Sequence, residues 1–172
     1  NNNTGGKMKL EKDEDAFNAV LTSLDSLVTF PFVAERVSDI KNALQKPLPV
    51  ILSKDSLDAN QKLAQLIAIN DSAFTKFLKD PSSKLPYRNE VFGVYPARQS
   101  DMGAVKAKYN LATSYRVEMY NYALNNTAIA IVDVQQQKVL FRYHLNSSQP
   151  DISYYLRNLA VKIAVESPEV QQ

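Results

Sequence analysis

The spacing of apolar residues divides the chain into a helical first part and a strand-rich second part. Apolar positions recur every three or four residues at 17–28 and, after a Phe-Pro-Phe break, again at 33–45. This spacing is typical of amphipathic helices, and two prolines soon afterwards end the second one. A third helix is expected at 57–79, because Ser56 or Asp58 is a suitable N-cap and apolar residues follow at helical spacing.

From residue 87 onward the period changes to two, which indicates strands. The strands are expected at 90–95, 115–123, 128–134 and 138–145. Short polar turns join the last three, which predicts an antiparallel meander. Polar and apolar residues alternate along these strands, as in a sheet with one covered face, and the helix at 57–79 is expected to cover it. The fold class is therefore α+β: a helix packed on a curved antiparallel sheet of about four strands, with amino-terminal helices and a carboxy-terminal helix at 154–166, capped by Asp151 or Ser153.

One helical phrase occurs twice. Residues 63–71 read Leu-Ala-Gln-Leu-Ile-Ala-Ile-Asn-Asp, and residues 159–167 read Leu-Ala-Val-Lys-Ile-Ala-Val-Glu-Ser. Such a repeat suggests a helix-then-sheet unit followed by the start of another, in an excised piece of a longer polypeptide. We therefore divide the chain into a disordered tail at 1–12, a helical extension at 13–55, a helix-plus-sheet domain at 56–150 and a helix at 151–172, which either opens a second repeat or closes the domain.

Composition excludes several classes of function. The 172 residues include 20 basic and 18 acidic side chains, with a net charge of +2, and lack the clustered lysines and arginines of a nucleic-acid interface. Cysteine is absent, which rules out disulfides, thiol catalysis and cysteine-ligated zinc. No apolar run approaches the roughly 20 residues that a membrane-spanning helix needs. We therefore expect no nucleic-acid partner, no membrane span and no cofactor.

Candidate chemical groups are few, and each has an ordinary structural explanation. His144 is the only histidine, so carboxylates would have to supply nearly all the ligands of a transition metal. Glu118 and Asp133 would serve acid–base chemistry if they were adjacent, although a cross-strand arginine such as Arg116 or Arg142 is the more usual partner of a carboxylate on a sheet. The acidic run at 13–15 suits the first turn of a solvated helix better than a cation site. No catalytic, cofactor-binding or metal-binding residue is assigned.

Tyrosines on the expected sheet form the one candidate interaction surface. Tyr115, Tyr120, Tyr122 and Tyr143 lie on two of the predicted strands. An aromatic row on a sheet is suited to stacking or to holding a peptide. Packing within the core is the commoner role of such rings, and it is the interpretation that we favour.

Several segments carry a resemblance to a known family. The helix phrase at 63–71 precedes a meander that contains Val-Asp-Val-Gln-Gln-Gln-Lys-Val-Leu at 132–140, and together they are similar to cystatin-like exported domains. Among these, the chain resembles PepSY domains and the small domains that precede the catalytic domain of copper amine oxidases. The segments most similar to exported bacterial proteins with such amine-oxidase-like amino-terminal modules are 115–134, 149–152 and 167–170. The resemblance covers about residues 57–170 and implies a helix on a curved antiparallel sheet, often in tandem copies.

The same resemblance brings no catalytic residue. The amine oxidase reaction uses several histidines on copper and a modified tyrosine within Asn-Tyr-Asp/Glu, whereas here Asn121 and Tyr122 precede Ala123 and there is one histidine. The resemblance therefore implies a non-catalytic accessory or interaction domain of a larger exported bacterial protein (periplasmic, cell-surface or secreted), which packs on a neighbouring domain or a protein or peptide partner. One alternative is a PepSY-type module that binds a peptide or protease through the exposed sheet or its edge. Another is a small enzyme with an unrecognised polar pocket.

Overall fold

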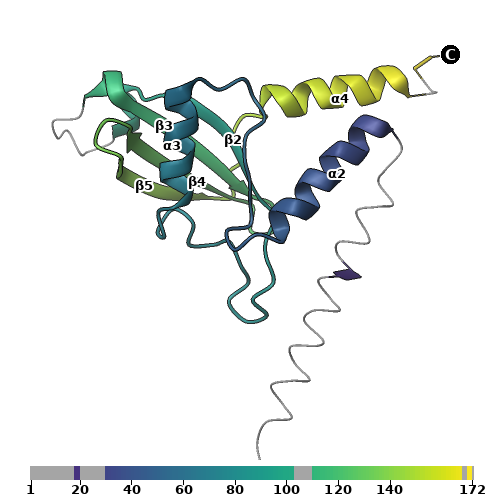
Figure 1. The fold of residues 1–172 in the computed structure, drawn as a ribbon, viewed down its shortest axis with the longest axis horizontal. Helices are drawn as coiled ribbons and strands as arrows, with labels where there is room; N and C mark the ends of the chain where they lie inside the picture. Colours follow the sequence, from purple (N-terminus) through teal and green to yellow (C-terminus); the bar gives the residue numbers. More distant parts are fainter. Residues whose placement is uncertain (1–17, 20–29, 103–109, 168–169, 172) are drawn as a thin grey trace, which may run out of the picture.

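The structure, a computed structural model, describes residues 18–19, 30–102, 110–167 and 170–171. Within these residues it confirms the α+β class, with three α-helices and one open, five-stranded, mostly antiparallel sheet. The helices are α2 (Pro31–Leu44), α3 (Ala59–Ile69) and α4 (Tyr154–Glu166), and the strands are β1 (Val50–Ile51), β2 (Asn89–Pro96), β3 (Ser114–Asn121), β4 (Asn126–Asp133) and β5 (Lys138–Asn146). In Figure 1, α3 lies in front of the sheet, while α2 and α4 extend away from it on one side.

The strands follow one another across the sheet in chain order, from β1 to β5. β3, β4 and β5 form the predicted meander, and the turns between them contain Asn125 and Gln137, whose φ angles of 47° and 52° lie in the left-handed region. β2 pairs antiparallel with β3, and β1 pairs parallel with β2. The sheet has five strands where about four were expected, because the short extended segment after Pro49 joins its edge.

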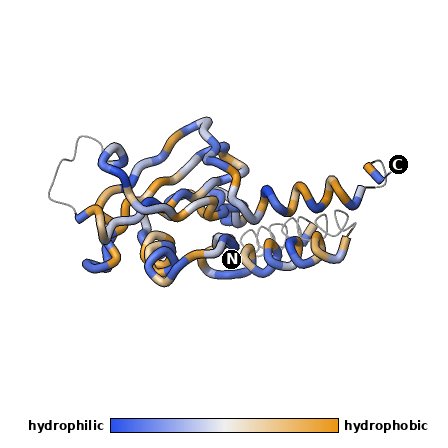
Figure 2. Tube along the Cα trace, turned by 90° about the horizontal axis from the view of Figure 1, so that it is seen from above, coloured by the Kyte–Doolittle hydropathy of each residue, from blue (hydrophilic) through white to orange (hydrophobic). Residues whose placement is uncertain are grey.

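Helix α3 packs on one face of the sheet through small side chains. Its N-terminus is a capping box, in which the Asp58 carboxylate accepts from the Gln61 amide and the Gln61 side chain accepts from the Asp58 amide. Ala64 and Ala68, on the side of α3 that faces the sheet, are fully buried, whereas Leu66 of the same helix is 47% exposed. Figure 2, seen from above, shows α3 along a single side of the sheet. The buried strand residues of this core are Val50, Val91, Val94, Tyr115, Val117, Met119, Ala128, Ala130 and Val132.

Helix α3 is shorter than predicted and ends at Ile69 instead of residue 79. The Asp71 carboxylate accepts hydrogen bonds from the amides of Ala73 at 3.1 Å and Phe74 at 2.8 Å, which closes a turn that competes with the helix. Phe74 still reaches the core and is fully buried, but it does so from this turn. The apolar periodicity beyond residue 70 therefore reflects burial without a helix.

A β-bulge in β5 changes the side-chain alternation that the sequence predicted for this strand. The pairing with β4 skips Leu140, the extra residue between Val139 and Phe141. Val139 therefore packs against the α3 side of the sheet, whereas Phe141 and Tyr143 pack on the opposite face with two buried isoleucines of β4. Simple alternation along β5 would have placed these three residues on one face, and the second face of the sheet carries an apolar cluster of its own.

Helix α2 packs on the β1 edge of the sheet. Ile40 and Leu44 form a small separate core with Ile51 of β1. Pro31 stands in the first turn, where a backbone N–H would have no acceptor within the helix, so proline is tolerated there. Helix α2 therefore begins two residues earlier than the predicted residue 33. The segment predicted as a helical extension thus contributes a strand to the sheet. The tail at 1–12, and the helix expected at 17–28 apart from residues 18 and 19, lie outside the described residues.

Candidate functional site

Helix α4 is fixed to the rest of the chain at its first turn. Ser153, the N-cap, accepts a hydrogen bond from the Leu156 amide at 3.2 Å. The Asp55 carboxylate accepts from the amides of Tyr154 at 3.3 Å and Tyr155 at 2.8 Å. A carboxylate in this position satisfies amides that the helix leaves unpaired and interacts favourably with the helix dipole.

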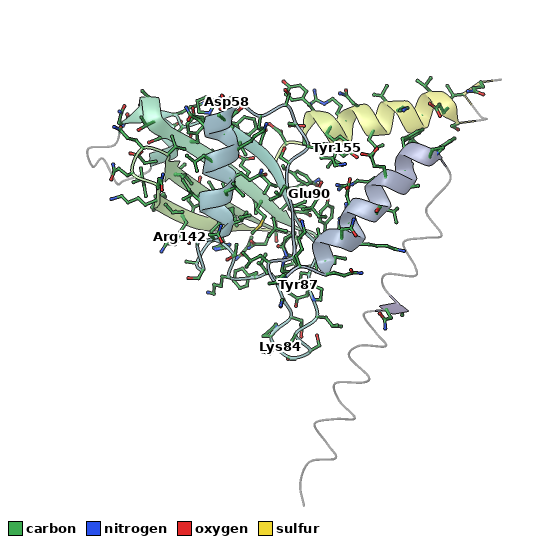
Figure 3. The ribbon with its side chains drawn as sticks, viewed as in Figure 1. Asp58, Lys84, Tyr87, Glu90, Arg142 and Tyr155 are labelled. Atoms are coloured by element: carbon green, nitrogen blue, oxygen red, sulfur yellow. The ribbon has the colours of Figure 1, made fainter. Side chains whose placement is uncertain are left out.

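Contacts between aromatic rings and cations join α4 to α2. The ring of Tyr155 has the guanidinium carbon of Arg36 at 5.8 Å and the ammonium of Lys54 at 5.4 Å from its centroid. Further along, the ammonium of Lys162 lies 4.4 Å from the centroid of the Phe32 ring. Figure 3 shows Tyr155 at the junction of the two helices. Each such contact contributes about 0.5–1 kcal/mol when it is exposed, so the junction is weaker than an apolar core.

Beyond its first turn, α4 leaves apolar side chains in solvent. None of its 13 residues is buried. Val161 is 57% exposed and Val165 is 59% exposed, and Ile152, just before the helix, is 51% exposed. Hydrophobic residues recur along the whole helix in Figure 2. Adjoining exposed apolar side chains are unusual on a monomer and mark interaction surfaces.

Two hollows adjoin the start of α4 on the face of the sheet away from α3, and we call them together the α4 groove. The first, about 360 Å³, lies between β2, β3 and the residues before α4, and it is largely polar. The second, about 610 Å³, lies between Phe92, Tyr122 and the side of α4, and it is mostly apolar. Asp151, Ile152 and Arg157 line both hollows, so the two meet. The groove is further defined by Tyr95, Arg116 and Glu118 in the first hollow and by Leu156, Ala160 and Val161 in the second.

Charged groups in the first hollow hold one another. Arg116 donates from Nη1 to Asp101 and from Nε to Glu118, each at 2.6 Å. Burial acts to lower the pKa of Arg116, but the two carboxylates outweigh it and raise that pKa. Burial, together with the nearby charge of Glu118, raises the pKa of Tyr95, so its phenol stays neutral at physiological pH. The hollow therefore contains an arginine that bridges two carboxylates beside a neutral phenol.

A buried ion pair fixes α2 to the sheet beside the groove. Nη2 of Arg36 lies 2.6 Å from both carboxylate oxygens of Glu90, and the two side chains are 6% and 4% exposed. The hydroxyl of Tyr122 donates to Glu90 at 2.9 Å, and burial followed by the Glu90 charge raises the pKa of this phenol. The guanidinium carbon of Arg88 lies 3.9 Å from the Tyr122 ring centroid. Figure 3 shows Glu90 where the sheet meets the two projecting helices.

The four tyrosines predicted as an interaction surface lie on two faces of the sheet. Tyr115 belongs to the core beneath α3 and is 9% exposed. Tyr143 packs with the cluster on the opposite face, and Tyr120, 7% exposed, packs its ring on Tyr122 at a centroid distance of 4.9 Å. Tyr122 is the member of the four that lines the α4 groove. A role of the other three in binding stays a prediction.

His144 has contacts of a structural kind. Its Nε2 lies 3.1 Å from the carbonyl oxygen of Ala73, and its Nδ1 lies 3.4 Å from the side-chain oxygen of Asn126. Its ring meets that of Phe77 edge-on at a centroid distance of 5.1 Å. These contacts tie β5 to the turn after α3, which accounts for an imidazole at this position.

The two carboxylates considered for acid–base chemistry do not meet. Glu118 is paired with Arg116, an arginine as the sequence favoured, but one on the same strand β3 and not across from it. Asp133 stands opposite Ser114 at the end of β4, four positions along the ladder from Glu118, and it accepts from the amides of the following turn. The acidic run at 13–15 lies outside the described residues. Among the residues that the structure describes, no three side chains of His, Cys, Asp or Glu gather as a metal site, and no helix is long and apolar enough to span a bilayer.

Two contacts that shape the site were missed by the sequence analysis, namely the Arg36–Glu90 pair and the Asp55 cap of α4. The sequence contains one signal of the Arg36–Glu90 pair. Arg36 lies four residues before Ile40 and eight before Leu44, on the buried stripe of α2. A charged residue on such a stripe needs a buried partner, although nothing local identifies a residue 54 positions away as that partner.

Comparison of the chain with models of known protein families, with curated proteins and with solved structures finds no match. The site is therefore interpreted from its own geometry.

Proposed function

We propose that this chain is a non-catalytic, cystatin-like interaction domain of a larger exported bacterial protein. It docks a neighbouring domain on the exposed face of α4 and in the α4 groove. The observation that carries the proposal is α4 itself, a 13-residue helix without a buried residue whose apolar side chains border an apolar hollow. Covering these side chains is favourable by about 25 cal/mol for each Å² of apolar surface removed from water.

The repeated helix phrase indicates which face of α4 is unsatisfied. Aligning its two copies pairs Ala160 and Ala164 of α4 with Ala64 and Ala68 of α3. The alanines of α3 are fully buried against the sheet, whereas their counterparts in α4 are exposed. Val161, between them, is 57% exposed and lines the groove. A flat apolar surface such as a second sheet fits this face, because small residues let a helix approach closely.

The polar side chains of the groove support a role in interaction. A catalytic acid or base must be within hydrogen-bond reach of its substrate. Here Glu118 and Asp101 already accept from Arg116, and the Tyr122 hydroxyl already donates to Glu90. Groups that satisfy one another in this way can form the polar rim of an interface, around an apolar centre at Ile152 and Val161.

The family and the location in this proposal come from the sequence. A helix across an antiparallel meander is the arrangement that the resemblance to cystatin-like exported domains implies, and the described fold has such a helix in α3. The exported location and the bacterial source rest on the resemblance.

Docking is tested by changing the exposed face of α4 within the complete parent polypeptide. Val161→Asp places a charge on the proposed contact face, while Asn158→Asp places the same charge at an exposed polar position of the same helix. We expect the α4 amides to exchange hydrogen slowly in the unchanged parent and in Asn158→Asp. In Val161→Asp, exchange should be at least about tenfold faster, because burying an unpaired carboxylate costs several kcal/mol.

Circular dichroism of the two variants in the isolated chain separates docking from folding. Neither substitution touches a buried residue, so both variants should keep the helix content and melting temperature of the unchanged chain. Equal protection of α4 in the two variant parents would contradict the proposal, as would an α4 that exchanges in the unchanged parent as fast as in the isolated chain.

A further inference from the structure

The second candidate surface is the outer edge of β5, the last strand of the sheet. Among the described residues no strand pairs with this edge. In an edge strand, alternate residues turn their amide and carbonyl groups outward, and this row of donors and acceptors is a template for one more strand. The nine residues of β5 are long enough to hold an extended segment along most of its length.

A hollow of about 620 Å³ lies beside this edge, between β5 and the second half of α3. Its apolar lining comes from Leu66 and Ile67 of α3 and from Val139 of β5. Leu66 is 47% exposed, although it stands in the middle of a helix that packs on the sheet. A segment added to β5 as a sixth strand would direct every second side chain into this hollow, where an aliphatic residue would cover Leu66.

Charge at the hollow selects the kind of segment. Lys138 and Arg142 both line it and are exposed, and Asp71 is the one acidic residue of its lining. Nε of Arg142 lies 3.1 Å from Asp71, with the Arg142 side chain 40% exposed. One positive charge is therefore left over, so acidic side chains on either side of a central aliphatic residue complement the hollow. Figure 3 shows Arg142 near the end of α3, on the far side of the domain from α4.

A second copy of this chain is a poor occupant. Full antiparallel pairing of two β5 strands across a twofold axis places the central residue of the nine opposite itself, and that residue is Arg142. Like charges directly opposite each other destabilise a strand pair, and the bulge at Leu140 interrupts a flat self-pairing further.

We propose that the outer edge of β5 and the adjoining α3 hollow bind an extended, acidic peptide segment of another protein as a sixth strand. Backbone hydrogen bonds to β5 supply the common part of the affinity, and the hollow with Lys138 and Arg142 selects the sequence. The surface lies opposite the α4 groove, so it does not depend on the docking proposed above, and either proposal can fail alone.

The probe is a fluorescein-labelled peptide, Ser-Thr-Glu-Thr-Val-Thr-Glu-Thr-Ser, titrated into the full chain. One control peptide has both glutamates replaced by lysine, and another is N-methylated at every central amide. Amide chemical shifts of the ¹⁵N-labelled chain locate the contact. We expect binding of the first peptide, with shifts concentrated in β5 and in the second half of α3, and loss of binding for the N-methylated peptide.

Charge reversal on the chain provides the matched test. Lys138→Glu and Arg142→Glu should each weaken binding of the acidic peptide by roughly three- to tenfold and strengthen that of the lysine peptide, as expected for exposed ion pairs. Lys79→Glu, an exposed lysine outside this hollow, should leave both affinities unchanged. The amide spectrum confirms that each variant is folded.

Three results would overturn the proposal. The first is an acidic peptide that binds no better than the N-methylated one. The second is a set of amide shifts of the chain that falls on Phe92, Tyr122 and α4. The third is sedimentation that shows the edge to be taken by a second copy. Each of these leaves the docking proposal for α4 to be judged on its own test.

Discussion

Replacing Phe74 with alanine is expected to lower the free energy of unfolding by about 3–5 kcal/mol. Phe74 is fully buried, and its ring belongs to the core between α3 and the sheet. It enters this core from the turn that Asp71 closes, so no neighbouring helix residue can fill the space that alanine would leave. Equilibrium unfolding in urea, followed by circular dichroism, measures the loss as a lower midpoint at unchanged slope.

Leu66→Ala is the matched control for this prediction. Leu66 is also a large apolar residue of the α3 region, but it is 47% exposed. Its truncation should cost less than about 1 kcal/mol, because little surface returns to water and no cavity forms. Equal losses in the two variants would mean that α3 faces the sheet with a different side from the one described.

Glu90→Gln is expected to cost about 3–5 kcal/mol, since it leaves the Arg36 guanidinium buried without its counter-charge. The two side chains are 6% and 4% exposed, and both carboxylate oxygens of Glu90 lie 2.6 Å from Nη2 of Arg36. The hydroxyl of Tyr122 also loses the anion to which it donates. The loss should appear in urea unfolding, together with faster hydrogen exchange in α2, which this pair holds on the sheet.

The adjacent residue on α2 offers the control. Glu35 also forms an ion pair, with Lys54 at 3.1 Å, but its side chain is 71% exposed. Glu35→Gln should therefore cost no more than about 1 kcal/mol. The double variant Arg36→Met with Glu90→Gln should be more stable than Glu90→Gln alone, because it removes the stranded charge. A double variant no more stable than Glu90→Gln alone would contradict this account of the pair.

Local sequence signals were sufficient for much of the fold. The helix at 154–166 was predicted with its observed bounds and with Ser153 among its two candidate caps, because caps act within one turn. The meander was predicted because alternation and short turns are also local. α3 was overextended because Phe74 continues the apolar spacing of the helix while Asp71, a local turn former, ends it.

Features that depend on contacts distant in sequence were not predictable. Nothing in residues 50–51 shows that they pair with β2, and no residue near Glu90 in the sequence identifies Arg36 of α2 as its partner. The bulge at Leu140 moves Phe141 to the face opposite α3, and only the register against β4 reveals it. The exposure of Val161 and Val165 on α4 likewise depends on how the helix sits against the rest of the chain, which no local signal specifies.

The central claim, that α4 awaits a partner, is tested most directly by hydrogen exchange of the isolated chain at concentrations where sedimentation shows a monomer. The account predicts that α4 amides beyond the turn capped by Asp55 exchange orders of magnitude faster than those of α3, because no residue of α4 is buried. A monomer in which α4 exchanges as slowly as α3 would contradict the claim, since the helix would then already be packed within this chain.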